Sequence, residues 1–201
     1  MKKWLIFDAM GVVFEAGVDI RDLLIPFIEN KKPVTDVKLI FDLYMKASLG
    51  KISSKDFWQA LGFKDWQKTE KDYLDNCLTL DKDFVKTAEQ LLQSYNLAML
   101  SNDVSEWSAY LRRKFDLDRL FKVVVISGDV GSRKPDKRIY DILLQQINAP
   151  AERCVFIDDR VKNLITASEL GIKPVLFNRD RIDPEGFVSA GSFAEILEVL
   201  L

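Results

Sequence analysis

The chain has 201 residues, enough for one domain with a sizeable insertion, and 48% of them are hydrophobic and 30% charged. The formal net charge of −2 gives no reason to expect nucleic acid or an anionic membrane as a partner. The chain contains no histidine, which excludes catalytic triads built on an imidazole and histidine ligands for a metal. Its two cysteines, Cys77 and Cys154, are too far apart for a Cys-x-x-Cys site.

The first predicted element is a short buried strand. The apolar run Trp4–Phe7 leads directly into Asp8, and two lysines precede it. This apolar run is too short for the core of a signal peptide, and no run in the chain approaches the length of a membrane span. We therefore expect a cytoplasmic location.

Residues 17–79 are predicted to form an all-helical insertion. Their apolar residues recur at helical spacing over the stretches 20–31, 37–50, 53–62 and 66–78. Ser53 or Ser54 is placed to cap the third helix. Four aromatic residues are predicted to form the core of the bundle, and one or two of them to line a substrate pocket: Phe41, Tyr44, Phe57 and Trp58.

The rest of the chain alternates strands and helices. Runs rich in Val, Ile, Leu and Phe predict buried strands at Leu97–Leu100, Val123–Ile126, Cys154–Ile157 and Pro174–Phe177. Amphipathic stretches predict helices at 105–115, 136–147 and 161–171, the last with Gly171 as its C-cap. This alternation predicts a doubly wound α/β fold, a parallel Rossmann-like sheet built from residues 1–16 and 80–201.

Polar side chains stand where the predicted strands end. Asp8 follows the first strand, Ser101 and Asn102 end the second, Lys134 lies in the loop after the third, and Asp158 and Asp159 follow the fourth. Ligands of open parallel sheets bind beyond the carboxyl ends of the strands, so we expect these side chains to converge.

Simpler explanations exist for most of these residues, and Asp8 also fits an ordinary turn. Asp158 and Asp159 are well suited to capping the following helix, and Ser101 is suited to capping as well. Lys134 precedes a proline and fits an exposed loop equally well. Asn163 fits either a contact with the acidic pair or an exposed position on a helix.

Four segments in this order resemble the motifs of the haloacid dehalogenase (HAD) superfamily. They are WLIFDAMGVVF, LAMLSND, SRKPDKRIY and CVFIDDRVKN. The resemblance covers the whole chain and is strongest to small phosphatases of sugar phosphates and related compounds. It implies a mobile helical cap inserted after the first motif, hinged near Glu15–Val18 and Leu78–Asp83. It also implies Mg²⁺ as cofactor and a small phosphorylated metabolite as substrate.

The same resemblance implies a role for each matching residue. Asp8 would be the nucleophile that forms an aspartyl-phosphate. The metal would be held by Asp8, the backbone carbonyl of Met10 and Asp159, with Asp158 acting through water.

The remaining matching residues would bind the transferring group. Ser101 and Asn102 would donate hydrogen bonds to the phosphoryl oxygens. Lys134 would neutralise charge on the phosphoryl group and on Asp8.

Met10 departs from the pattern of the family's phosphatases, which carry a second aspartate two residues after the nucleophile. A thioether neither donates nor accepts a proton usefully, and general acid–base help is worth ~10²–10⁴-fold in rate. One explanation is that another acid, such as Glu15, Asp19 or Asp22, takes over this role.

Two other functions stay open. The chain is also compatible with a weakly active or non-catalytic protein that binds phosphoryl groups. A 2-haloacid dehalogenase is the third candidate, because that branch lacks the second aspartate and a departing halide needs no proton. The acidic pair in FIDDR argues against it, since these carboxylates would repel Asp8 without a cation.

Overall fold

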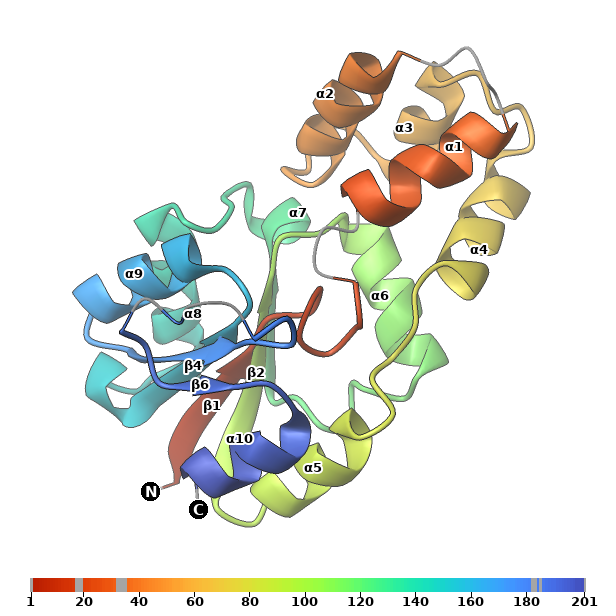
Figure 1. Ribbon diagram of the computed structural model, residues 1–201. Coiled ribbons are helices and arrows are strands. Elements are labelled where there is room, and N and C mark those ends of the chain that lie inside the picture. The colour runs from red at the N-terminus through yellow and green to blue at the C-terminus, as the bar shows by residue number, and fades with distance from the viewer. Residues whose placement is uncertain (1, 17–19, 32–35, 182–183, 185, 201) are drawn as a thin grey trace.

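The computed structural model describes residues 2–16, 20–31, 36–181, 184 and 186–200 (Figure 1). Its centre is a parallel sheet with the strand order β3-β2-β1-β4-β5-β6. The strands are β1 Lys3–Phe7, β2 Tyr95–Ser101, β3 Val123–Ile126, β4 Cys154–Asp158, β5 Lys173–Phe177 and β6 Ser189–Ala190. The order reverses between β1 and β4, which confirms the predicted doubly wound fold.

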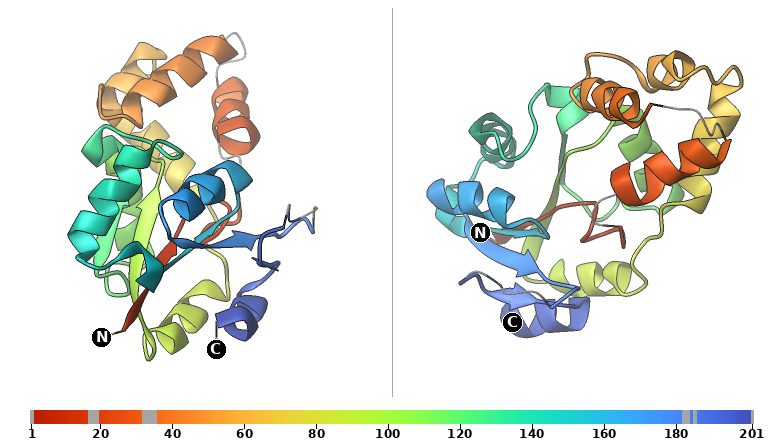
Figure 2. Two further views of the ribbon diagram at one scale, coloured as in Figure 1. Left: turned by 90° about the vertical axis from the view of Figure 1, so that its left-hand side faces the viewer. Right: turned by 45° about the horizontal axis from the view of Figure 1, so that its top comes forward.

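Helices cover both faces of the sheet (Figure 2). They are α5 Phe84–Leu91, α6 Ser105–Lys114, α7 Ser127–Val130, α8 Lys137–Ile147, α9 Val161–Glu169 and α10 Phe193–Leu200. Because side chains alternate along a strand, Leu5 and Phe7 of β1 pack with α5, α6 and α10. Ile6 faces the other way and packs with α8 and α9.

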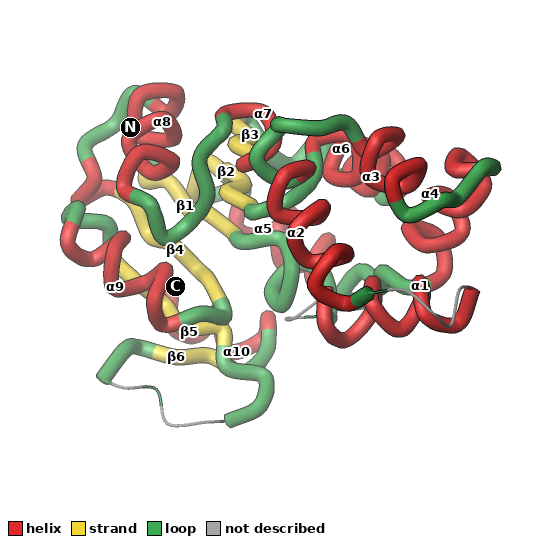
Figure 3. The backbone as a smooth tube through the Cα atoms, turned by 90° about the horizontal axis from the view of Figure 1, so that it is seen from above, coloured by secondary structure: helices red, strands yellow, loops and turns green. Residues whose placement is uncertain are grey.

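The helices between β1 and α5 form a group beyond the carboxyl ends of the strands, seen from above in Figure 3. A π-helical turn, Ile20–Leu24, leads into α1 Ile25–Lys31, followed by α2 Val37–Ala47, α3 Ser54–Ala60 and α4 Trp66–Asn76. Ser53 caps α3, and its hydroxyl accepts a hydrogen bond from the amide of Asp56. We refer to this group as the cap; its exact boundaries, residues 17–79, stay a prediction.

The core of the cap is aromatic. Tyr44, Phe57 and Trp58 are buried as predicted. The prediction is wrong for Phe41, whose side chain is 46% exposed. Helix α2 buries the face that carries Ile40 and Tyr44. Phe41 follows Ile40 in the sequence but lies outside this buried face of the helix.

The strands agree closely with the prediction. The predicted strands are present within two residues of their expected bounds, whereas β6, with two residues, is too short to leave a periodic signal.

Among the described residues, no helix has both the length and the apolar character that crossing a bilayer requires.

Candidate functional site

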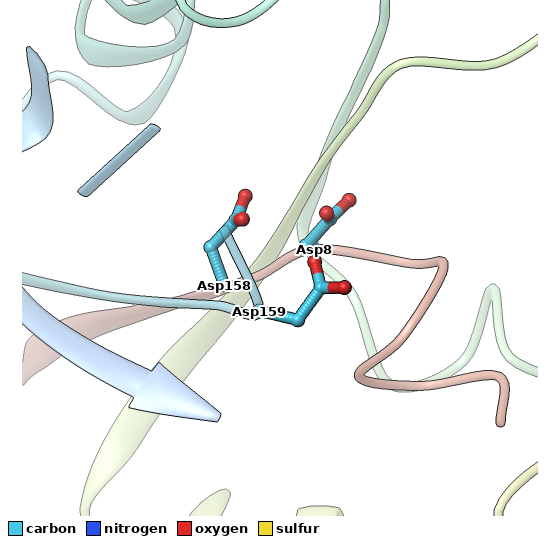
Figure 4. Close-up of side chains that lie close together, drawn as sticks. All are labelled: Asp8, Asp158 and Asp159. Atoms are coloured by element: carbon cyan, nitrogen blue, oxygen red, sulfur yellow. The ribbon is translucent and has the colours of Figure 1, made fainter. Parts of the chain in front are cut away.

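Three carboxylates meet at the carboxyl edge of the sheet. Asp8 follows β1, Asp158 is the last residue of β4, and Asp159 comes next. Because β1 and β4 are hydrogen-bonded neighbours, one carboxylate oxygen from each residue lies within 4.8 Å of the others. Figure 4 shows the three side chains converging.

Lys134 is buried between two of these carboxylates. Its Nζ lies 2.7 Å from Asp8 Oδ1 and 2.7 Å from Asp158 Oδ2. Burial alone would lower the pKa of Lys134, but the charges of Asp158 and Asp8 outweigh burial and raise it. Lys134 is therefore an ammonium ion of the site, and its interpretation as an exposed loop residue is wrong.

Asp158 is fully buried, and its acceptors are used within the protein. Its carboxylate accepts hydrogen bonds from Lys134 Nζ, from Asn163 Nδ2 and from the amide of Arg160. Asn163 is itself buried, so the expectation of an exposed helix residue is wrong. The capping interpretation of the acidic pair is also wrong, because Arg160 is the N-cap of α9 and no side chain caps that helix.

Asp159 has the opposite character. Its Oδ1 is buried and finds no hydrogen-bond partner in the part of the chain that the structure describes, although the guanidinium of Arg160 lies 3.9 Å away. Burial raises the pKa of Asp159 to about 7, and the charge of Asp158 adds to this effect. Burial likewise raises the pKa of Asp8, against the opposing charge of Lys134. A buried oxygen without a partner among three carboxylates fits a hard divalent cation.

Ser101 and Asn102 lie on the neighbouring strand end. The hydroxyl of Ser101 is buried and has no hydrogen-bond partner among the described residues. It does not cap α6, whose N-cap is Val104, so the capping interpretation of Ser101 is wrong. The side chain of Asn102 accepts from the amide of Lys134 at 2.7 Å and donates to its carbonyl at 2.9 Å. Asn102 thus holds the loop that carries Lys134.

The turn after Asp8 brings Met10 to the same place. Gly11 has a φ of +84°, a conformation that glycine adopts without steric cost. Its amide donates to the carbonyl of Phe14 at 2.9 Å, and the amide of Phe14 donates to Ala9 at 2.8 Å. The turn leaves Met10 nearly buried, and Met10 lines the site.

A small cavity of about 30 Å³ opens onto Asp8. It is lined by Asp8, Met10, Ser101, Asn102, Asn163, Arg133 and Arg160, and by Ile20 and Tyr44 from the cap. The sequence analysis missed Arg133 and Arg160. Each stands next to a motif residue, Lys134 or Asp159, and this adjacency was the signal that could have found them.

Of the acids suggested in place of Met10, the two that lie in the described part of the chain, Glu15 and Asp22, do not line this cavity. Glu15 lines a separate cavity of about 110 Å³ that also contacts Asp159 and Arg179. Asp22 pairs with Arg21 at the surface. Asp19 lies outside the described residues.

Residues 3–171 match the family model of haloacid dehalogenase-like hydrolases, and the chain belongs to this family. This family consists of haloacid dehalogenase-like hydrolases. The particular activity of this chain is a separate question.

Several named proteins are similar to the chain. The sesquiterpene phosphatase astK of Aspergillus oryzae is 26% identical over 85% of this chain and 87% of that protein. The (S)-2-haloacid dehalogenase 4A of Burkholderia cepacia is 28% identical over 65% of this chain and 62% of that protein. Drimenol cyclase drtB of Aspergillus calidoustus is 35% identical over 49% of this chain, but the match spans only 19% of the cyclase.

Solved structures share the fold. A HAD family enzyme of Bacteroides thetaiotaomicron, solved in complex with magnesium and inorganic phosphate, matches with a TM-score of 0.74. It is 19% identical, and the match covers 88% of this chain and 94% of that one. Identity at this level supports the architecture alone.

Proposed function

We propose that this protein is a Mg²⁺-dependent phosphatase that hydrolyses a small phosphorylated metabolite through an aspartyl-phosphate on Asp8. The observation that carries the proposal is the cluster of three carboxylates, two of them buried and Asp159 half-buried, with Lys134 bound to Asp8 and Asp158. Two adjacent acids beside a nucleophilic carboxylate repel one another unless a cation joins them.

The donor set suits magnesium. Asp159, with its unpartnered oxygen, and Asp8 would hold the ion, together with the backbone carbonyl of Met10. Asp158 would contact it through water. Bound Mg²⁺ would supply positive charge against the oxygens of the phosphoryl group. The structural neighbour from Bacteroides thetaiotaomicron, which shares the fold, was solved in complex with magnesium and inorganic phosphate.

The side chains of the chain itself account for most of the reaction. A carboxylate oxygen of Asp8 attacks phosphorus while the bond to the leaving oxygen breaks. Lys134 balances the negative charge of Asp8 and of the phosphoryl group, and the free hydroxyl of Ser101 donates to a phosphoryl oxygen. Water then attacks the phosphorus of the aspartyl-phosphate, which returns the Asp8 carboxylate and releases phosphate.

Two other functions are tested with the same protein. Met10 favours a phosphoryl-binding protein with little turnover, since it removes the usual proton donor. The relative that is a haloacid dehalogenase favours carbon–halogen hydrolysis. The pair of Asp158 and Asp159 beside Asp8 disfavours the dehalogenase, because three carboxylates share the ammonium of Lys134.

The test is hydrolysis of p-nitrophenyl phosphate, a substrate whose leaving group needs little help from an acid. We expect turnover that requires Mg²⁺ and is lost in Asp8→Asn, a variant of nearly the same shape without nucleophilic charge. Binding of BeF₃⁻ without turnover would instead indicate the phosphoryl-binding protein. Release of chloride from 2-chloropropionate in EDTA would indicate the dehalogenase.

A further inference from the structure

Tyr44 brings a phenol from the cap to the wall of the cavity that opens onto Asp8. It lies on α2 and lines this cavity together with Met10 and Ser101. Its hydroxyl is 3.4 Å from the backbone carbonyl of Asn102, the residue after Ser101. The phenol therefore stands beside the strand end where the phosphoryl group would lie.

A positive charge accompanies this phenol. The guanidinium of Arg133 lies 5.5 Å from the centre of the Tyr44 ring. Arg133 also donates to the hydroxyl of Ser48, and that hydroxyl donates to the carbonyl of Tyr44 at 2.8 Å. Within the described residues Arg133 forms no ion pair, so its charge is available to stabilise a phenolate.

The other described side chains that line the cavity are poor proton donors. Asp8 is the nucleophile, and arginine does not give up its proton in proteins. Alcohols and amides are far weaker acids than phenol. A phenol, with an ordinary pKa of about 10, is acidic enough to protonate an alkoxide as it leaves.

We propose that Tyr44 is the proton donor that replaces the aspartate missing at Met10. This inference rests on the proposed phosphatase function and names a further catalytic residue for it. As the bond between phosphorus and the leaving oxygen breaks, the Tyr44 proton passes to that oxygen. The phenolate then takes a proton from the water that attacks the aspartyl-phosphate, so that Tyr44 is restored when phosphate forms.

The test compares two substrates in Tyr44→Phe, which keeps the ring and removes only the hydroxyl. We expect kcat/KM for ethyl phosphate to fall by ~10²-fold or more, the usual worth of a general acid. For p-nitrophenyl phosphate we expect a loss below about tenfold, since nitrophenolate leaves with little protonation. Equal losses on both substrates would overturn the proposal, because a merely structural role affects both alike.

Three controls keep the result interpretable. Tyr73→Phe makes the same change at another buried cap tyrosine, whose ring lies 5.5 Å from Trp107, and both activities should stay near wild type. Orthovanadate should bind to Tyr44→Phe with unchanged affinity. In the Tyr44→Phe protein, adding Met10→Asp should restore the hydrolysis of ethyl phosphate. Failure of this rescue would contradict the proposal that Tyr44 donates the proton in place of an aspartate at position 10.

A measurement on the unmodified protein covers the case in which Tyr44→Phe does not fold. Across a series of alkyl and aryl phosphates, phosphoenzyme formation should depend only weakly on the pKa of the leaving group. A steep dependence would overturn the role of Tyr44 and leave the phosphatase function intact. Absence of any Mg²⁺-dependent hydrolysis would overturn both proposals.

Discussion

Asp158 and Asp159 are neighbours in sequence with opposite surroundings. Asp158 uses its oxygens on Lys134, Asn163 and the amide of Arg160. Asp159 keeps a buried oxygen that no other described residue hydrogen-bonds, and burial raises its pKa to about 7. Asp158 therefore positions Lys134, and Asp159 has an oxygen available to bind a cation.

This difference predicts how pH controls the affinity for Mg²⁺. A cation competes with the proton on Asp159, so affinity should be highest above pH 7. Below pH 7 it should fall about tenfold per pH unit for one proton, and the raised pKa of Asp8 acts in the same direction. Calorimetry between pH 5.5 and 8.5 measures this slope and the proton released on binding.

Asp159→Asn provides the comparison for this titration. The variant should bind Mg²⁺ weakly, and the pH dependence that Asp159 contributes should disappear, whereas Asp141→Asn on the exposed side of α8 should match wild type. In the metal-free protein, stability should change with pH in the direction opposite to the Mg²⁺ affinity. Because folding raises the pKa of Asp159, this residue's contribution to the free energy of unfolding declines as pH rises toward 7. A wild-type affinity that is flat across pH 7 would contradict the assignment.

At this scale the sequence predicts residues that belong to short motifs. Asp8, Lys134 and the acidic pair follow buried strands, and this pattern is visible in a single sequence. Tyr44 reaches the site only because the cap packs there. The apolar spacing of its helix predicts that Tyr44 is buried but not which residues it contacts. A tertiary contact of this kind leaves no local signal.

Among the elements, the loop after β5 holds two distant segments together through Arg179. Its guanidinium donates to the carbonyls of Gly11 and Val12 and pairs with Asp81 at 2.7 Å. The ring of Phe177 lies 4.7 Å from the same group. One side chain thus fixes both the turn that carries Met10 and the segment that returns from the cap.

We call these contacts of Arg179 the Arg179 clamp. Removing the clamp should loosen both the turn that carries Met10 and the segment that returns from the cap. Arg179→Ala leaves two carbonyls and a carboxylate without their donor, so we expect a loss of about 1–3 kcal/mol in the free energy of unfolding. Hydrogen exchange should accelerate at the amides of Glu15 and Asp81, which bond across the two segments to Thr79 and Val13. Urea unfolding and exchange measured by mass spectrometry test these expectations.

Arg181→Ala is the matched control on the same loop. Its ion pair with Glu195 is exposed to solvent, so its loss should change the free energy of unfolding much less than the loss of Arg179 does. Arg179→Lys keeps the charge but lacks the planar set of donors, so it should recover only part of the loss. Equal behaviour of Arg179→Ala and Arg181→Ala would show that the clamp is not a structural constraint.

The elements themselves are largely predictable from the sequence. Continuous apolar runs predict the buried strands, and the amphipathic spacing predicts α2, α3, α4, α6, α8 and α9. Phe41 shows the limit, because apolar character alone does not fix which face of α2 is buried. The clamp of Arg179 joins residues almost 170 positions apart, and no local pattern predicts such a contact.

In the whole molecule, the cap contacts the sheet domain on two sides of the site. On one side Glu70 of α4 accepts a hydrogen bond from Trp107 of α6 at 2.7 Å. On the other, the end of α2 rests on α7, where the hydroxyl of Ser127 donates to the carbonyl of Ser48 at 2.6 Å. We call this second contact the α2–α7 seam. The cavity of about 30 Å³ at Asp8 is too small to hold a phosphorylated metabolite. Entry of a substrate therefore requires one side to separate, and the seam has fewer aromatic contacts than the side at Trp107.

Gly50→Ala should hold this seam open. Gly50 has a φ of +67°, and an added Cβ would lie 2.2 Å from the carbonyl oxygen of Gly128 on α7. Gly131→Ala is the matched control, because its φ of +65° carries the same backbone cost while its Cβ would lie 3.8 Å from the nearest atom. With Mg²⁺ present, orthovanadate should bind about tenfold more weakly to Gly50→Ala than to Gly131→Ala, since 1.4 kcal/mol of lost closure corresponds to that factor. Hydrogen exchange should rise at residues 48–51 in Gly50→Ala alone and stay unchanged along α6. If both variants bind vanadate equally, substrates enter by another route and the seam does not control access to Asp8.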